Sequence, residues 1–317
     1  MSNILIFHWN NVLVDVEQEL IKRGHKVRSF TKYPMPKKEF EEIKKSYYWT
    51  DVVLFWNEIE KFGWKEQIEA AKKAKARTIL YQHGRRGTSR IFPPFNEKLL
   101  CDTVMAWGEG DKKRFISAGI DKDKIKVAGA PIFKFLEPRQ KHEGTNIVFC
   151  TEHWCEDVPE NYIVASQLRK TGLNIITKCL KVGVITELLD NPVISDRAEP
   201  NHLEIVANVL SKADLVVGIS ESTFELFAEY LDIPVVIADI WQPKACDGDD
   251  RYKEYRRIYS NACLREKNIF NIGKTIKWYL KHPDYLREER KQTCIDDGGA
   301  NIKNPTEEII KVIEGKK

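Results

Sequence analysis

The chain has 317 residues, of which 42% are hydrophobic and 31% charged, and its formal net charge is +4 at pH 7. These values are typical of a globular protein of one or two domains, and the small positive charge permits an anionic partner without requiring one. The seven cysteines form no Cys-x-x-Cys pair, which argues against zinc and disulfide frameworks and favours reduced thiols. No window approaches ~20 consecutive apolar residues and the N-terminus lacks signal-peptide features, so we expect a cytoplasmic protein without a transmembrane segment.

Short apolar runs alternate with helical patterns in the first half of the chain. We predict strands at residues 3–7, 25–30, 51–56, 77–81, 103–107 and 125–128, and helices at 12–23, 64–76 and 111–118. Gly24 suits the position just after a helix, where a left-handed residue is common. Strands that alternate with helices favour a parallel sheet with right-handed crossovers.

A second alternating series follows a polar linker. Residues 137–144 contain Pro and Gly among polar side chains, as linkers do. Strand-like runs then occur at 145–150, 173–177, 215–219 and 235–238, and the segment from about residue 268 is helical and charged. We therefore predict an α/β protein with two facing doubly wound parallel-sheet (Rossmann-like) domains, 1–136 and 145–317, and a cleft between them.

The turn after the strand at 215–219 is the first candidate site. Ser222 with Glu225 three residues later is a capping-box pattern, which predicts that a helix begins there. Ser220, Ser222 and Thr223 then place hydroxyl groups at a helix N-terminus, where the helix dipole favours an anion. An ordinary capped helix that binds nothing is the alternative.

The turn after the strand at 77–81 is the second candidate site. It holds His83 with Arg85 and Arg86 between two glycines. Histidine can transfer a proton near neutral pH, and the planar arginine group matches phosphate oxygens. The alternative is a solvated basic loop whose histidine only caps a backbone group.

Further polar residues follow other predicted strands, and parallel strands bring their carboxyl ends to one edge of a sheet. Each of these residues could also be an ordinary loop or capping residue. They are His8, Trp9, Asn10, Asn11, His153, Lys178, Asp239, Trp241 and Gln242.

Several other catalytic and metal-binding patterns are missing from the sequence. Asp247, Asp249 and Asp250 lack the spacing of a calcium loop, and the histidines are too dispersed for zinc. No P-loop or G-x-G-x-x-G follows a predicted strand, and no G-x-S-x-G elbow occurs. We therefore expect no metal ion, no dinucleotide cofactor and no serine-hydrolase triad.

The order of several short motifs resembles that of GT-B fold glycosyltransferases. The branch in question includes CDP-glycerol glycerophosphotransferases, capsule-polysaccharide enzymes and non-hydrolysing UDP-N-acetylglucosamine 2-epimerases. The resemblance covers roughly residues 80–135 and 210–312. One departure is Thr177-Lys178-Cys179-Leu180, where those transferases usually have Lys/Arg-x-His-Pro. The motifs are Gln82-His83-Gly84, Ala106-Trp107-Gly108, Ala118-Gly119-Ile120, 125–131, Ala213-Asp214, Ser222-Thr223 with Glu225, Ile233-Pro234-Val235 and Asp297-Gly298-Gly299-Ala300.

The resemblance implies a metal-independent glycosyltransferase without a cofactor. It would move a sugar or related group from a UDP- or CDP-linked donor to a hydroxyl of a polysaccharide, glycolipid or small molecule. His83 would act at the reacting centre. The donor would contact Lys178, Ser220, Ser222, Thr223, Glu225, Arg85 and Arg86. Acceptor or cleft residues would be His8, Trp9, Asn10, Asn11, His153, Asp239, Trp241 and Gln242.

Two other functions stay open. A non-hydrolysing UDP-sugar 2-epimerase would share the fold. A nucleic-acid-binding protein, or a glycosyltransferase acting on modified DNA, would use the basic runs Lys112-Lys113-Arg114 and Arg85-Arg86. Acidic residues interspersed among the basic ones favour a solvated surface over a nucleic-acid interface.

Overall fold

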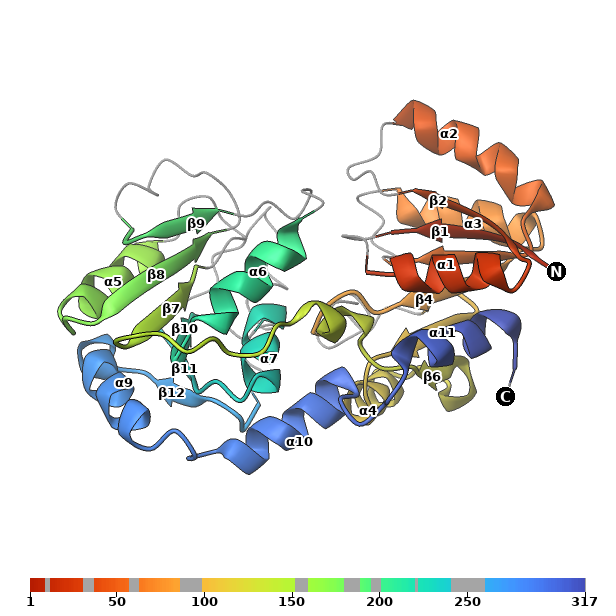
Figure 1. Cartoon of the computed structure of the whole chain (residues 1–317). Coiled ribbons are helices and arrows are strands. Elements are labelled where there is room, and N and C mark those ends of the chain that lie inside the picture. Colours follow the sequence, from red (N-terminus) through yellow and green to blue (C-terminus); the bar gives the residue numbers. More distant parts are fainter. Residues whose placement is uncertain are drawn as a thin grey trace. The chain divides into compact units, whose positions relative to one another are not determined.

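A computed structural model describes residues 1–8, 12–30, 37–56, 63–85, 99–151, 159–179, 189–194, 201–219, 222–240 and 260–316 (Figure 1). The chain divides into two compact units. The first consists of Met1–Ile132 together with Ile295–Lys317, and the second is Phe133–Cys294. In the described part of the chain no helix is long and apolar enough to cross a membrane.

The first unit is built on a six-stranded parallel sheet. Its strands are β1 (Asn3–Phe7), β2 (Lys26–Phe30), β3 (Val52–Phe55), β4 (Arg77–Tyr81), β5 (Thr103–Ala106) and β6 (Ile125–Val127). Their order is β2-β1-β3-β4-β5-β6, and every neighbouring pair is parallel. All four residues of β3 are buried, as expected for a strand covered on both faces.

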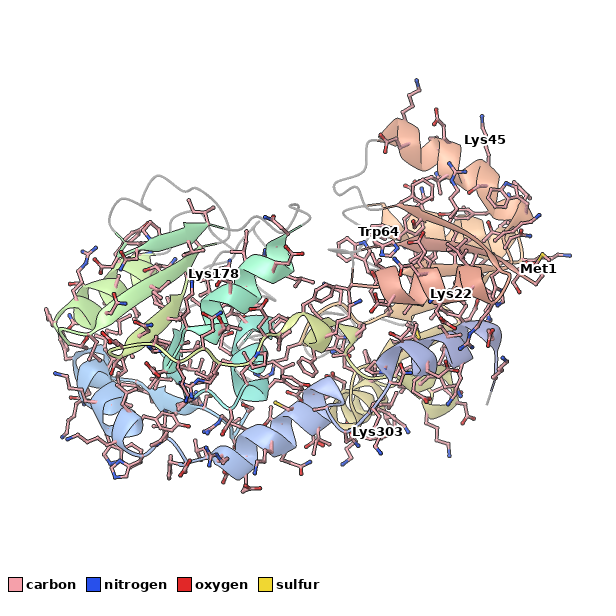
Figure 2. The ribbon with its side chains drawn as sticks, viewed as in Figure 1. Met1, Lys22, Lys45, Trp64, Lys178 and Lys303 are labelled. Atoms are coloured by element: carbon pink, nitrogen blue, oxygen red, sulfur yellow. The ribbon has the colours of Figure 1, made fainter. Side chains whose placement is uncertain are left out.

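Helices and short 3-10 turns pack beside this sheet. They are α1 (Val14–Lys22), α2 (Lys37–Ser46), α3 (Trp64–Lys73), α4 (Glu109–Ser117) and α11 (Pro305–Glu314), with short 3-10 turns η1 (Tyr47–Trp49), η3 (Lys122–Lys124) and η4 (Pro131–Phe135). Trp64, labelled in Figure 2, stands at the start of α3 and packs edge-on against Phe7 of β1, with ring centroids 5.2 Å apart. Gly24 follows α1 with a φ of +84°, so the predicted helix end is confirmed.

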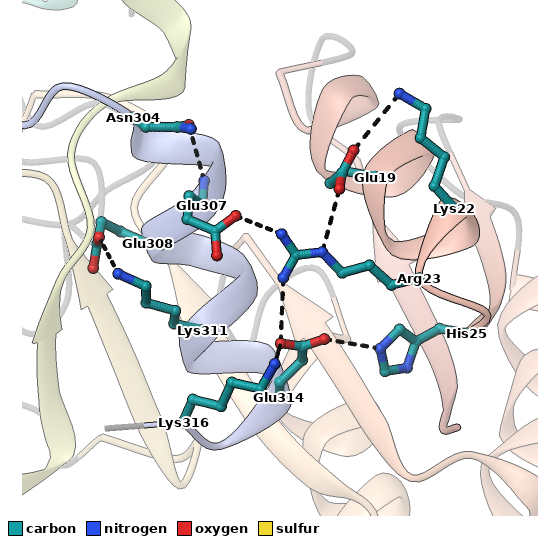
Figure 3. A network of polar contacts seen from close by, with 10 residues as sticks. All are labelled: Glu19, Lys22, Arg23, His25, Asn304, Glu307, Glu308, Lys311, Glu314 and Lys316. Atoms are coloured by element: carbon teal, nitrogen blue, oxygen red, sulfur yellow. Dashed lines mark hydrogen bonds and ion pairs between the residues drawn. The ribbon is translucent and has the colours of Figure 1, made fainter.

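The helix α11 returns to the first unit, although we expected residues 145–317 to form one domain. Arg77 of β4 donates hydrogen bonds to the carbonyl oxygens of Val312, at 3.0 Å, and Ile313. Arg23 after α1 pairs with Glu307 at 2.5 Å and with Glu314 at 3.4 Å (Figure 3). These contacts explain why the last segment groups with the N-terminal sheet.

The second unit contains another six-stranded parallel sheet. Its strands are β7 (Asn146–Cys150), β8 (Asn174–Cys179), β9 (Pro192–Ile194), β10 (Leu215–Gly218), β11 (Val235–Ala238) and β12 (Leu264–Glu266). Their order is β12-β11-β10-β7-β8-β9, which is the Rossmann order 6-5-4-1-2-3 when counted within this unit. The prediction of two doubly wound parallel sheets is therefore confirmed.

Helices alternate with these strands and follow them, and some contribute apolar residues to the core of the sheet. They are α5 (Pro159–Arg169), α6 (His202–Ser211), α7 (Thr223–Tyr230), α9 (Ile272–Lys281) and α10 (Arg287–Gly298), with the 3-10 turn η7 (Ile269–Asn271) before α9. Ile272, Ile276 and Tyr279 of α9 belong to the same buried cluster as Phe149 of β7 and Val217 of β10. The chain passes within α10 from the second unit back to the first.

Candidate functional site

In the second unit the strand order reverses between β7 and β10. These two strands are direct neighbours, with Val217 opposite Phe149. The chain leaves β7 through Thr151, and it leaves β10 towards the start of α7. Ligands of open α/β sheets bind outside the carboxyl ends of strands at such a switch point, so this edge is the candidate donor site.

The N-terminus of α7 carries the predicted capping box, which is confirmed. Phe224 N–H donates to Ser222 Oγ at 3.1 Å, and Glu225 Oε2 accepts from the Ser222 N–H at 2.7 Å and from its hydroxyl at 2.5 Å. The box holds the Glu225 carboxylate, and the residue is only 1% exposed. Thr223, the first residue of α7, is partly exposed and keeps its predicted place at the helix start.

Lys178 was predicted to follow a strand, but the structure places it inside strand β8. Strand β8 continues to Cys179 because its last residues pair with both neighbours, Lys178 lying opposite Cys150 and Val193. The Lys178 side chain, labelled in Figure 2, is buried, and its Nζ donates to the carbonyl oxygen of Cys179 at 2.9 Å. Thr151 at the end of β7 donates its N–H and its hydroxyl to the carbonyl oxygen of Lys178, at 3.1 and 3.2 Å.

In the first unit, His83 lies in a turn that the side chain of Gln82 stabilises through hydrogen bonds. The Gln82 amide donates to the carbonyl oxygen of Gly84 at 3.0 Å and to Asp111 at 2.7 Å, and its Oε1 accepts from the Trp107 N–H at 2.9 Å. The half-buried His83 ring packs edge-on against Trp56, with centroids 5.0 Å apart. The turn thus follows β4 at its carboxyl end, where the sequence placed it.

Arg85 anchors the other side of the same turn. Its guanidinium is buried and pairs with Asp297 of α10 at 3.1 Å. Arg114 of α4 also pairs with Asp297, and with Asp111 at 2.6 Å. Burial, and to a lesser extent the Asp297 charge, raises the pKa of Asp111 to about 6 although Arg114 opposes the shift. This ion cluster gives Arg85 an anchoring role, and its predicted contact with a donor phosphate stays a prediction.

The remaining predicted residues divide into two groups. His8 is 3% exposed and lies 2.9 Å from Glu17; burial lowers its pKa, which favours the neutral ring. Asp239 after β11 is paired with Arg265 at 2.6 Å. Both side chains thus have partners inside the protein. Eight predicted residues lie outside the described ranges, namely Trp9, Asn10, Asn11, Arg86, His153, Ser220, Trp241 and Gln242.

Sequence reasoning missed the residues that fix the His83 turn. Asp111 stands at the predicted start of a helix, and nothing in its local pattern distinguishes it from a solvent-exposed acid. Asp297 was noted only as part of a glycine-bearing motif. Among the described residues no group of three or more His, Cys, Asp or Glu side chains could hold a metal ion.

Comparisons with protein-family models and with curated proteins give no match. Solved structures do match. UDP-GlcNAc 2-epimerase from Neisseria meningitidis, solved bound to UDP-GlcNAc, aligns over 100% of both chains with a TM-score of 0.66 and 14% identity. The Methanocaldococcus jannaschii UDP-GlcNAc 2-epimerase, solved in complex with UDP-GlcNAc and UDP, aligns with a TM-score of 0.65 and 16% identity. The alignment covers 99% of this chain and 100% of the epimerase chain. The wall teichoic acid polymerase TagF aligns with a TM-score of 0.62 and 10% identity, over 99% of this chain and 88% of the TagF chain.

These likenesses define the class of fold. The matched proteins are members of the GT-B superfamily, and their alignments span both sheets of this chain. The chain therefore has a GT-B-like fold, as the motif order predicted. At 10–16% identity the similarity is one of architecture.

Proposed function

We propose that this protein is an enzyme that transfers a sugar or a related group from a nucleoside-diphosphate donor to an acceptor hydroxyl. The observation that carries the proposal is the Rossmann-ordered second sheet, with the N-terminus of α7 at its switch point. Pyrophosphate groups favour such helix starts because the backbone N–H groups and the helix dipole stabilise negative charge. Structures of the same fold contain UDP, UDP-GlcNAc or CDPG, which supports a uridine or cytidine diphosphate donor here.

The donor diphosphate would lie against Thr223, Ser222 and the end of β7 at Thr151. The departing nucleoside diphosphate gains charge as the bond to the transferred group breaks. A preorganised helix N-terminus stabilises that charge without reorganisation, which is the main catalytic effect available without a metal ion. The chemistry we propose therefore needs no divalent cation and no further cofactor.

His83 would accept the proton of the acceptor hydroxyl. Histidine has the pKa range for this task, and the anchored turn holds the ring against Trp56. The hydrogen bonds of Gln82 and the Arg85–Asp297 pair fix the backbone on both sides of the ring. A general base must be held within hydrogen-bond reach of its proton, and a rigid turn meets that need.

A sugar-nucleotide 2-epimerase is the second candidate. Two of the aligned structures with the higher TM-scores are UDP-GlcNAc 2-epimerases, and they cover this chain from end to end. The two activities differ in their requirement for an acceptor. An epimerase converts the nucleotide sugar alone, whereas a transferase releases the nucleoside diphosphate only when an acceptor is present.

The first experiment is a thermal-shift screen with UDP, CDP, GDP, ADP and dTDP, each with and without its sugar. A true ligand at ~100 times its dissociation constant should stabilise the protein by about 2.7 kcal/mol. Turnover is then followed by NMR with and without acceptors, in excess EDTA. Activity that disappears in EDTA and returns with Mg²⁺ would contradict the metal-free mechanism.

The His83→Ala variant tests the catalytic assignment. We expect turnover to fall by roughly 10²–10⁴-fold, the usual range for a general acid or base, with donor affinity unchanged. His142→Ala is the matched control, because His142 lies in the linker before β7 and contacts Asn146 and Asp214. Full activity in His83→Ala would remove His83 from the mechanism.

A further inference from the structure

Helix α9 presents two different faces. Ile272, Ile276 and Tyr279 are buried in the core of the second unit. Lys274, Lys277, Trp278 and Lys281 are exposed and follow one another at spacings of three, one and three residues. Residues three, four and seven positions apart share one side of a helix, so these four side chains form a single outward stripe.

The stripe borders a hollow on the surface of the second unit. The hollow has a volume of about 560 Å³ and lies between α9 and the end of α5. Lys170 and Thr171 come from the α5 side, and the exposed Phe270 lies in the turn η7 just before α9. We call Lys170, Phe270, Lys274, Lys277, Trp278 and Lys281 the α9 surface.

The α9 surface is positively charged. Within the described ranges none of its four lysines forms an ion pair, and Lys170 only donates to the side-chain oxygen of Gln167, at 3.3 Å. Nearby carboxylates have other partners: Asp190 pairs with Arg169, Asp284 with Arg287, and Glu266 accepts from Thr275. The ammonium groups are therefore available to an external anion.

Aromatic rings project from the same surface. Phe270 is 78% exposed, Trp278 43% and the neighbouring Tyr285 47%. One face of Trp278 stacks on His282 at 4.5 Å, and its ring meets Tyr285 edge-on at 5.1 Å. The buried Arg290 fixes the turn that carries Tyr285 by donating to the carbonyl oxygens of Pro283 and Tyr285, at 2.9 and 2.8 Å.

The lysines and the exposed aromatic rings together indicate which kind of anionic partner the α9 surface favours. A nucleic acid or glycan would use open aromatic faces for stacking, but His282 already covers one face of Trp278. Trp and Tyr favour the headgroup level of a bilayer, and lysine stems lie along apolar surface while their charged ends reach phosphate.

We propose that the α9 surface docks on an anionic phospholipid bilayer. Its four lysines face lipid phosphates, and Phe270, Trp278 and Tyr285 enter the interfacial layer. A lysine near such a surface contributes about fivefold to the membrane partition coefficient. Docking would be reversible and sensitive to salt, because screening weakens charges at the surface. The inference is independent of the proposed enzymatic activity.

The test is co-sedimentation of the full chain with vesicles rich in phosphatidylglycerol and with vesicles of phosphatidylcholine alone. We expect binding to the first and not to the second. Lys274→Gln/Lys277→Gln/Lys281→Gln should weaken binding about 100-fold, the product of three fivefold losses. The matched control is Lys122→Gln/Lys124→Gln/Lys126→Gln, since these lysines are exposed on the first unit. It should bind like the unchanged protein.

A second pair of variants tests the aromatic part. Phe270→Ser should weaken vesicle binding, whereas Tyr48→Ser should not, although Tyr48 is equally exposed at 77%. Circular dichroism and melting curves establish that all variants are folded. Absence of vesicle binding by the unchanged protein, or equal losses in the test and control variants, would overturn the proposal. Binding to duplex DNA or polyphosphate through the same lysines, without vesicle binding, would also overturn it and indicate a polyanion partner.

Discussion

Replacing Asp297 by Asn removes the charge at the centre of the buried ion cluster. Its carboxylate accepts from Arg85 at 3.1 Å and from Arg114, and the Asp297 side chain is 5% exposed while that of Arg85 is 1% exposed. The substitution preserves volume, so it tests charge rather than packing. It leaves two guanidinium groups sharing the single remaining carboxylate of Asp111.

The expected cost is large because the surviving charges are buried. Breaking a buried ion pair by removing one partner costs about 3–5 kcal/mol, whereas an exposed pair is worth about 0–1 kcal/mol. Because 1 kcal/mol shifts the melting temperature of a unit of this size by roughly 2–4 °C, the melting temperature of the first unit should fall by roughly 6–20 °C. Asp190→Asn is the matched control, because Asp190 pairs with Arg169 at 2.8 Å and the two side chains are 36% and 46% exposed, far more than Asp297 and Arg85.

Calorimetry and urea unfolding measure the stability of Asp297→Asn and Asp190→Asn, and hydrogen exchange shows which part of the protein is destabilised. Protection should fall in the first unit, around β4, α4 and α11, and stay unchanged in residues 133–294. A second variant, Arg85→Met/Asp297→Leu, should recover part of the stability, since apolar replacement of a whole buried pair is often neutral. If Asp297→Asn were no more harmful than Asp190→Asn, the reasoning from burial would be refuted.

Three further substitutions test other parts of the structure. Gly108→Ala should cost about 3 kcal/mol in urea unfolding, the upper end of the usual range for overpacking, because its Cβ would overlap the backbone carbonyl oxygens of Asp296 and Ile295, which cannot rotate away. Asp111→Asn should change how the free energy of unfolding depends on pH. The pKa of Asp111 is about 6 in the folded protein and 3.8 in the unfolded chain, so this residue stabilises the fold most below about pH 4 and progressively less up to about pH 6. The stability of the unchanged protein relative to this variant should therefore decrease between those values, and an increase would contradict the assignment. Ser222→Ala should cost about 1 kcal/mol through loss of the cap on α7, whereas Ser117→Ala at an exposed position should be near neutral.

The elements with continuous apolar runs could be predicted from the sequence. Strands such as Asn3–Phe7 are buried on nearly every residue, so their composition alone identifies them. Strand β8 was predicted to end at Thr177, with Lys178 in the segment that follows. It continues through Lys178 and Cys179 because these residues pair with the neighbouring strands, and the buried Lys178 ammonium donates to the carbonyl oxygen of Cys179. Helix α2 (Lys37–Ser46) was not predicted, since its sequence is mostly charged and Phe40 and Ile43 are its only large apolar residues.

The candidate site shows a similar division between local and long-range information. The capping box at Ser222 and the turn at His83 depend on neighbouring residues, and the sequence located both. The partner of Arg85 could not be found in this way, because Asp297 is 212 positions away in the chain. A basic residue in a predicted loop therefore suggested a phosphate contact, whereas the fold supplies an internal carboxylate.

The return of the last helix to the N-terminal unit has a consequence for biosynthesis. The first unit lacks α11 until the ribosome has made the whole second unit, residues 133–294, which takes on the order of 10–30 seconds at about 5–20 residues per second. The apolar surface that later receives Ile309, Ile310 and Ile313 stays uncovered for that time. We expect the second unit to complete its fold first on the nascent chain, with the N-terminal sheet held as an unfinished intermediate that general chaperones can bind.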